Sequence, residues 1–189
     1  METLLGALEL WEFAARLKDE PRRGWKRVPR IRRVESVADH AFGVAVLSLF
    51  EGAGRGYNVE RILTLALIHD LEEAITGDLT PEDKRKLKSR KVRSLRKAAR
   101  TQITNLIPIN LRGKYGRMWR DLENGRTREA RLVKDLDKLE MLLQARRYES
   151  LGVSSRKMEK FYRSAIGRIK DEQIRKNARL LAKPGRLDR

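Results

Sequence analysis

The sequence contains no cysteine and no long apolar run. Without cysteine the chain has no disulfide framework, no thiolate metal site and no thiol nucleophile. The longest apolar runs, Phe42 to Phe50 and Ile62 to Ile68, are much shorter than the roughly 20 residues of a membrane-spanning helix. The N-terminus carries Glu2, Glu9 and Glu12 where a secretory signal has basic and apolar blocks. We therefore predict a cytoplasmic protein that does not contact a membrane.

Strand patterns, internal repeats and a Gly-rich phosphate loop are also missing. Apolar residues recur instead at helical spacing, and 189 residues are enough for one sizeable core. The sequence predicts an all-α fold, a helical bundle forming one domain over residues 1–183, followed by a mobile basic tail at 184–189. In the first helix, over residues 3–18, Leu4, Leu8, Trp11 and Ala15 form one stripe, which we expect to dock on the core.

Acidic residues are few relative to basic ones: 26 Asp and Glu against 44 Lys and Arg, a formal net charge of +18. Such a charge attracts polyanions, which suggests anionic substrates or nucleic acid. A heat-adapted surface is the alternative, although ion-pair networks usually need more acid. Arg22 to Arg33 is a basic loop that suits a nucleotide and a solvated connector equally well. Lys84 to Arg100 has ten basic residues and no acid, which favours a solvated basic helix.

The segment Asn58 to Asp78 begins as an apolar run and ends in groups able to bind metal or move protons. Asn58 can cap the N-terminus, and Gly77 can end the segment in a left-handed conformation, which predicts one helix of about five turns. On such a helix His69 and Glu73 share a face, and Asp70 lies about 100° round the axis from His69. One ion could then bind both His69 and Asp70.

Two other helices carry comparable groups. Ser36 and Asp39 form a capping box that places His40 in the first turn of a helix. Taken alone, such a histidine is more often a capping or packing residue than a ligand. Thr127 can begin a helix through Glu149 in which Asp137 falls among buried leucines. An unpaired buried carboxylate costs several kcal/mol, so Asp137 needs a metal, an arginine or backbone donors. A last helix begins at Ser154 or Ser155 and continues through Leu180.

The chain has only two histidines, each beside an aspartate. His40, His69, Asp70 and Asp137 together offer two imidazoles and two carboxylates, a set suited to one divalent ion. Manganese, cobalt, nickel, iron, zinc and magnesium all remain open. Closed coordination of a purely structural ion is an alternative to a catalytic site.

Three segments, ESVADH, LIHDLEEAITGDLTP and LVKDLDKLEMLLQA, resemble the signatures of the HD-domain metal-dependent phosphohydrolases, most closely those of the 5′-deoxynucleotidase subgroup. The resemblance spans roughly Leu4 to Tyr162. It implies one divalent metal held by four ligands, for which His40, His69, Asp70 and Asp137 are the matching positions. It also implies a homodimer.

The same resemblance assigns the remaining site residues. Glu73 matches the catalytic acid or base, and Asp78 matches an aspartate that either protonates the leaving 5′-oxygen or holds the sugar. Arg22 and Trp25 match a loop that meets the phosphate and the sugar. Helix geometry, and not the resemblance, places Glu72 about 100° round the axis from Glu73, so Glu72 is expected to form a salt bridge or to support the site.

The expected function is hydrolysis of the 5′-phosphate of nucleoside, chiefly deoxynucleoside, monophosphates by a metal-activated water. One alternative is hydrolysis of a cyclic or pyrophosphorylated nucleotide. Another, which the basic segments favour and the complete set of site residues does not, is an HD-fold protein that binds nucleic acid. The acid-free segment Lys84 to Arg100 departs from the family pattern and leaves room for a larger anionic ligand.

Overall fold

The computed structural model describes residues 2–183, and every regular element in that range is a helix. The helices are α1 (Glu2–Asp19), α2 (Arg23–Lys26), α3 (Val37–Gly54), α4 (Val59–Ile68), α5 (Glu73–Thr76), α6 (Pro81–Lys86), α7 (Ser89–Asn105), α8 (Ile109–Asn124), α9 (Arg128–Ser150), α10 (Ser155–Arg168) and α11 (Glu172–Leu181). The prediction of an all-α fold is confirmed. The predicted tail at 184–189 lies outside the described residues, and the domain boundary at 183 stays a prediction. None of the helices described is long and apolar enough to cross a membrane.

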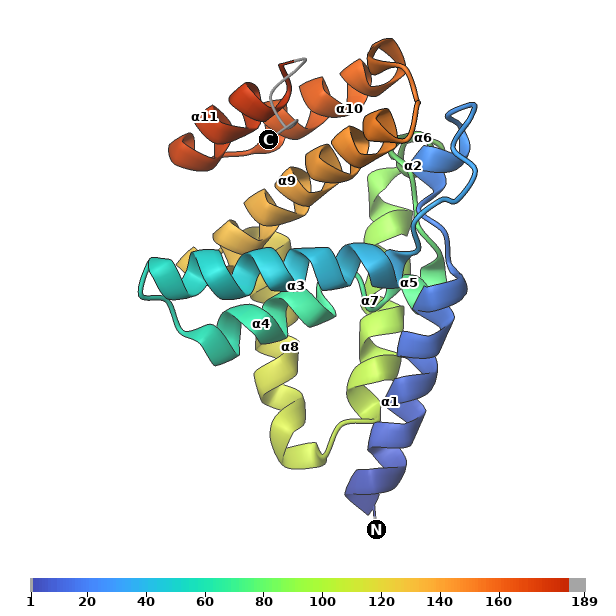
Figure 1. Ribbon diagram of the computed structural model, residues 1–189. Helices are drawn as coiled ribbons and strands as arrows, with labels where there is room; N and C mark the ends of the chain where they lie inside the picture. Colours follow the sequence, from blue (N-terminus) through green and yellow to red (C-terminus); the bar gives the residue numbers. More distant parts are fainter. Residues whose placement is uncertain (1, 184–189) are drawn as a thin grey trace.

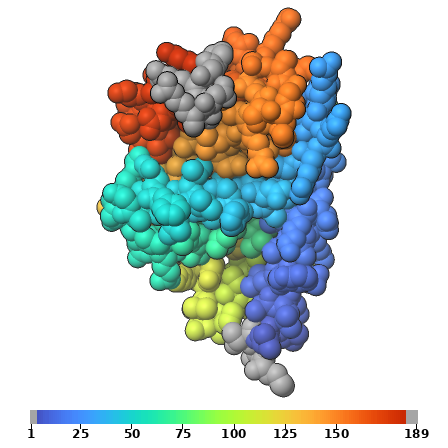
Figure 2. Space-filling model, in the orientation of Figure 1, coloured from blue at the N-terminus to red at the C-terminus, as the bar shows by residue number. Residues whose placement is uncertain are grey.

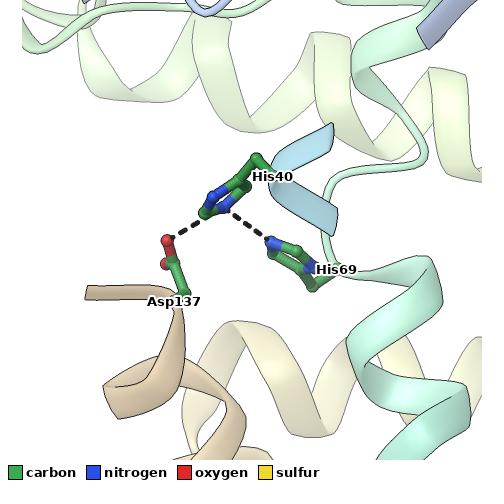
Figure 3. A group of neighbouring side chains, drawn as sticks. All are labelled: His40, His69 and Asp137. Carbon is green, nitrogen blue, oxygen red and sulfur yellow. Dashed lines mark hydrogen bonds and ion pairs between the residues drawn. The ribbon is translucent and has the colours of Figure 1, made fainter. Parts of the chain in front are cut away.

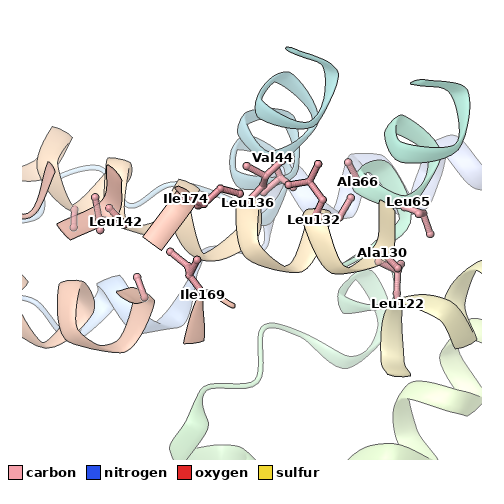
Figure 4. Packing of buried hydrophobic residues seen from close by; sticks show 14 of the residues in the cluster. Val44, Leu65, Ala66, Leu122, Ala130, Leu132, Leu136, Leu142, Ile169 and Ile174 are labelled. Atoms are coloured by element: carbon pink, nitrogen blue, oxygen red, sulfur yellow. The ribbon is translucent and has the colours of Figure 1, made fainter. Parts of the chain in front are cut away.

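Helix α9 is the centre of the packing (Figure 1). It contacts α3, α4, α8, α10 and α11, and its buried side carries Leu132, Leu136 and Leu142. These leucines belong to one hydrophobic cluster with Val44 of α3 and Leu65 of α4 (Figure 4). Burying one such side chain stabilises the fold by about 1.5–3 kcal/mol. The cluster therefore fixes α3, α4 and α9 relative to one another, and these three helices position the predicted ligands.

The start of α3 agrees with the sequence. The Ser36 hydroxyl accepts a hydrogen bond from the Asp39 N–H at 3.0 Å, and the Asp39 carboxylate accepts one from the Ser36 N–H at 2.9 Å. This confirms the predicted capping box. Because the cap fixes where the helix begins, it also fixes the direction of His40, which is completely buried one residue later.

The segment Asn58 to Asp78 is not one helix, and that prediction is wrong. Helix α4 begins after Asn58, whose side chain accepts from the Arg61 N–H as expected, but it ends at Ile68. Four turn residues, 69–72, then lead into the short α5. Gly77 follows α5 with φ +69° and ψ 166°, so its φ is positive as predicted but its backbone is extended and not left-handed helical. Asp70, Glu72 and Glu73 therefore lie beyond the end of α4 and do not continue that helix.

A tertiary contact explains where α4 ends. The Ile68 carbonyl accepts a hydrogen bond from the Trp119 indole N–H of α8 at 3.1 Å, as well as one from the Leu71 N–H at 3.2 Å. In a continuing helix this carbonyl would bond the N–H of residue 72. Satisfying it from another helix removes one reason for the chain to continue as a helix.

The buried side of α1 differs from the prediction. Phe13 and Leu17 are buried, whereas Leu4, Leu8 and Trp11 are 67%, 56% and 56% exposed. Helix α1 contacts α3 and α5, and Figure 2 shows it along the outside of the molecule. The prediction that the Leu4 stripe faces the core is therefore wrong. A helix with two apolar stripes does not reveal from its own spacing which stripe will be covered.

The last predicted helix is two helices. Between α10 and α11 the backbone N–H groups of Lys170 and Asp171 both donate to the Asp135 carboxylate of α9, each at 2.9 Å. Asp135 is only 4% exposed. The carboxylate satisfies donors that would otherwise need helical carbonyls, and the chain turns at this point.

Candidate metal centre

Two imidazoles and a carboxylate from three segments meet at one place (Figure 3). His40 lies in the first turn of α3, His69 follows α4 and Asp137 lies within α9. His40 Nε2 is 3.4 Å from His69 Nε2 and 3.3 Å from Asp137 Oδ1. The structure thus brings together three groups that the sequence predicted to share an ion.

Asp70, the fourth predicted ligand, lies beside the two histidines. Its Oδ2 is 3.2 Å from His69 Nε2 and 3.8 Å from His40 Nε2. The same oxygen is 3.4 Å from Arg22 Nη1. Asp70 therefore joins the cluster from the side on which Arg22 approaches.

The second ring nitrogen of each histidine is already in use. His69 Nδ1 lies 2.6 Å from the Ala66 carbonyl oxygen, and His40 Nδ1 contacts the Glu140 carboxylate. A carbonyl oxygen and an ionised carboxylate only accept, so each Nδ1 carries the proton and donates. In the neutral rings both Nε2 atoms then present lone pairs to each other across 3.4 Å. Two carboxylates beside facing lone pairs fit a divalent cation.

The pKa values report the strong negative field of this cluster. Burial lowers the pKa of His69, but Asp70 and Asp137 outweigh burial and raise that pKa to about 9. Burial raises the pKa of Asp137, but Lys138 and the two histidines hold it well below its usual range. Lys138 Nζ is 2.5 Å from the Asp137 carboxylate. The cation paired with Asp137 is therefore a lysine, and not the arginine considered from the sequence. Opposed shifts among buried groups in a cleft are typical of functional sites.

Glu140 is a site residue that the sequence reasoning missed. It lies one helical turn after Asp137 on α9 and is 8% exposed, in contact with His40 Nδ1. Gly43 of α3 leaves room for it, because a Cβ at that position would lie 2.9 Å from Glu140 Cγ. The spacing of three residues from Asp137 was a usable signal, since residues at i and i+3 share a helix face.

Glu73 and Glu72 lie just beyond the cluster and are 3% and 0% exposed. Arg96 of α7 donates to Glu73 Oε1 at 3.2 Å, and Arg100 donates to Glu72 Oε1 at 2.8 Å. The expectation that Glu72 forms a salt bridge is confirmed. The basic helix is not simply solvated, as the sequence favoured. Two of its arginines compensate buried carboxylates, and no local pattern in the sequence indicates this pairing.

One oxygen of Glu73 remains without a partner. Its Oε2 is buried and has no hydrogen bond among the described residues. Burial raises the pKa of Glu73 well above its usual range, and Asp70 and Asp78 raise it further against the opposing charges of Arg22 and Arg96. Such a carboxylate is ready to accept a hydrogen bond or a proton from a molecule in the cavity.

The cavity at the centre has a volume of about 680 Å³. His69, Asp70, Glu73, Asp78 and Asp137 all line it. A cavity of several hundred cubic ångströms is typical of a small-molecule site. The groups able to bind metal and those able to move protons therefore face one space.

The predicted phosphate and sugar contacts also lie at this cavity. Asp78 Oδ2 accepts from the Arg23 backbone N–H at 2.7 Å, which ties the loop after α5 to α2. Arg22 and Trp25 line the same space. Trp25 is only 2% exposed and donates its indole N–H to Glu35 at 2.6 Å. Its polar atom is thus already used, and only its ring can meet a ligand.

Comparison with known proteins gives a consistent picture. The family model described as HD domain matches residues 14–178. The 5′-deoxynucleotidase HDDC2 of Xenopus laevis is 37% identical over 88% of this chain and 81% of its own length. The human protein of the same name is 36% identical, over 89% and 82%. The crystal structure of the PH0347 protein of Pyrococcus horikoshii has a TM-score of 0.75 and 28% identity, covering 92% of this chain and 99% of that one.

Proposed function

Since this chain belongs to the HD domain family, whose model matches it over residues 14–178, we propose that it is a phosphoric monoester hydrolase acting on deoxynucleoside 5′-monophosphates. The observation that carries this proposal is the pair of facing Nε2 atoms of His40 and His69 beside two carboxylates at a nucleotide-sized cavity. The relatives named 5′-deoxynucleotidase support the choice of substrate, because they are similar over most of both chains.

His40, His69, Asp70 and Asp137 would hold the divalent ion. When bound there, such an ion neutralises charge on phosphoryl oxygens and makes hydroxide available near neutral pH. Glu140 and the Ala66 carbonyl keep the two rings in the tautomer that leaves Nε2 free to coordinate. The ions that suit this donor set are manganese, cobalt, nickel, iron, zinc and magnesium.

Glu73 is proposed as the group that takes the proton of the attacking water. Its unpaired Oε2 is available, and its raised pKa makes the carboxylate a stronger base than an exposed glutamate. Arg96 holds the other oxygen at 3.2 Å. One oxygen therefore fixes the side chain, and the other is left to accept the proton of the attacking water.

Asp78 is proposed to act on the leaving-group side, either by protonating the 5′-oxygen or by holding the sugar. It is 9% exposed at the cavity, and the Arg23 N–H fixes its Oδ2. Arg22 is proposed to bind the phosphate, since its guanidinium already lies 3.4 Å from Asp70 and suits charge-assisted hydrogen bonds to phosphate oxygens. Trp25 supports this loop and offers its ring to the sugar.

Phosphate release from the four deoxynucleoside 5′-monophosphates, with manganese or cobalt added, tests the proposal. We expect turnover by the wild-type protein and its loss in His69→Ala and Asp70→Ala, with unfolding measured to show that both variants fold. Asp19→Ala is a matched control, because Asp19 is an exposed carboxylate at the end of α1. A folded, metal-loaded wild-type protein inert on all four nucleotides contradicts the proposal.

Two further proposals concern the state of the protein. We propose that two copies associate, supported by the exposed Leu4, Leu8 and Trp11 on α1 and by the family resemblance. Light scattering on wild type and Leu8→Glu checks this, and a monomeric wild type contradicts it.

A cytoplasmic location is supported by the cysteine-free sequence and is checked by cell fractionation.

A further inference from the structure

The cavity carries far more positive charge than one phosphate needs. Eleven lysines and arginines line it, against six aspartates and glutamates. Six of the eleven have no acidic partner within ion-pair distance among the described residues, and they come from four helices: Lys84, Arg85, Arg93, Lys134, Lys160 and Arg168. One phosphate bound near Arg22 leaves these six cations without an anion.

Two of these lysines respond to the crowding of positive charge. Burial lowers the pKa of Lys84, and Arg96 lowers it further. Burial lowers the pKa of Lys134, and Lys170 and Lys138 add to the effect. Like charges around a cleft repel one another and concentrate anions there. An additional anion beside Lys84 or Lys134 would offset this repulsion.

Helix α7 extends the charge beyond the cavity. At 3.6 residues per turn, positions 90, 93 and 97 lie within about 60° of one another round the axis. Arg90, Arg93 and Lys97 are all exposed, and none has an acidic partner among the described residues. Arg93 lines the cavity, whereas Arg90 and Lys97 do not. The three side chains, called here the α7 band, thus lead from the cavity onto the outer surface.

An aromatic ring stands at the same cavity. Phe161 of α10 lines it, packs against Trp25 with ring centroids 4.0 Å apart and has Lys160 Nζ 5.0 Å from its centroid. A partly exposed ring within a basic groove is the combination on which single-stranded nucleic acids stack their bases. A nucleoside polyphosphate would account for the extra cations inside the cavity, but it gives no role to Arg90 and Lys97, which lie outside the cavity.

We propose that the substrates of this site include short single-stranded oligonucleotides with a 5′-phosphate, whose strand leaves the cavity across the α7 band. The proposal rests on the proposed function and extends its substrate class. The bond chemistry is unchanged. The attacking water gives a proton to the Glu73 carboxylate as its oxygen bonds to phosphorus, the bond between phosphorus and O5′ breaks, and O5′ takes a proton. The products are inorganic phosphate and an oligonucleotide with a 5′-hydroxyl.

The test compares phosphate release from a deoxynucleoside 5′-monophosphate, a 5′-phosphorylated pentadeoxynucleotide and a deoxynucleoside triphosphate, each against salt concentration. The variant Arg90→Gln/Arg93→Gln/Lys97→Gln removes the α7 band. We expect it to lower kcat/KM for the pentanucleotide about tenfold more than for the monophosphate. In the wild type we expect the slope of log kcat/KM against log salt to be steeper for the pentanucleotide by about 2, as for three phosphate contacts to a single strand.

The matched control is Lys176→Gln/Arg179→Gln/Lys183→Gln. It removes the same charge at the same spacing from the α11 end of the chain, and none of the three residues lines the cavity. An equal loss in both triple variants overturns the proposal, because the effect would then be general charge. Turnover of the monophosphate without turnover of the pentanucleotide overturns it while leaving the proposed function standing. The oligonucleotide proposal is also overturned if removing the α7 band lowers kcat/KM for the triphosphate but not for the pentanucleotide. A wild-type protein inert on all three substrates overturns both the oligonucleotide proposal and the proposed function.

Discussion

Arg96 Nη2 lies 3.2 Å from Glu73 Oε1 and joins the basic helix α7 to the carboxylate proposed to take the proton of the attacking water. The other oxygen of Glu73 is buried without a partner. Arg96 also lies 3.5 Å from Glu72. The arginine therefore holds the carboxylates of two consecutive residues at the start of α5 and leaves the second oxygen of Glu73 without a partner.

Replacing Arg96 should impair the reaction through Glu73. Arg96 lowers the pKa of Glu73 against burial and nearby acids, so Arg96→Gln should raise that pKa. The ionised form of Glu73 would then appear only at higher pH. The acidic limb of the plot of kcat against pH should therefore shift to higher pH, and kcat at neutral pH should fall about tenfold. A kcat profile against pH measures this. Lys91→Gln is the control, because Lys91 is exposed on the same helix and outside the cavity. An unshifted limb in Arg96→Gln contradicts the role.

The parts of the site that could be predicted depend on local or motif information. The capping box of Ser36 and Asp39 is a four-residue pattern, and it correctly predicted that His40 lies in the first turn of a helix. His69 and Asp137 were singled out by the chemistry of their side chains, and the resemblance of their segments to known signatures grouped them at one ion. Helical spacing alone does not show which distant segments will meet. Figure 3 shows that the three side chains do meet.

The parts that could not be predicted depend on partners far away in the chain. Helix α4 ends at Ile68 because Trp119, 51 residues later, bonds its carbonyl. The arginines of α7 looked solvated because the acids that pair with them lie 23 to 28 residues earlier. The exposure of Leu8 depends on which stripe of α1 meets α3 and α5. None of these choices is encoded within one helix.

Removing the metal should lower thermal stability. Binding to the folded state at about 100 times the dissociation constant adds about 2.7 kcal/mol. For a chain of this length that corresponds to roughly 5–10 °C in Tm. We expect chelator-treated wild type to gain this shift when manganese is added and His69→Ala not to gain it. Scanning calorimetry checks both, with Asp19→Ala as a control that should shift like wild type. Equal shifts in wild type and His69→Ala would remove His69 from the ligand set.

Glu140 should tune metal affinity without touching the ion. It contacts His40 Nδ1 and fixes the ring so that Nε2 faces His69. Loss of such an orienting partner typically costs 10–100-fold in metal affinity. Titration calorimetry with manganese should show a loss of about that size in Glu140→Ala. Glu140→Gln keeps an acceptor for the Nδ1 proton and should recover part of the affinity. Wild-type affinity in Glu140→Ala would show that His40 does not need this contact.

Glu35 should make the metal-free protein less stable as pH rises. Burial, followed by the charge of Glu140, raises the pKa of Glu35 to about 7 from its ordinary 4.5. The folded state thus favours the protonated acid. Its contribution to stability is complete below the ordinary pKa of 4.5 that the unfolded chain keeps and is lost as pH rises through about 7, by up to about 3 kcal/mol.

Glu35→Gln isolates this contribution. The amide oxygen can still accept the Trp25 indole N–H, which Glu35 binds at 2.6 Å, but the side chain no longer titrates. Urea unfolding of the chelated proteins at pH 5 and pH 8 should show a smaller fall in unfolding free energy for Glu35→Gln than for wild type. If both proteins lose the same free energy between these pH values, Glu35 is ionised in the folded state at both, and its burial among Trp25, Tyr148 and Glu140 does not control the pH dependence.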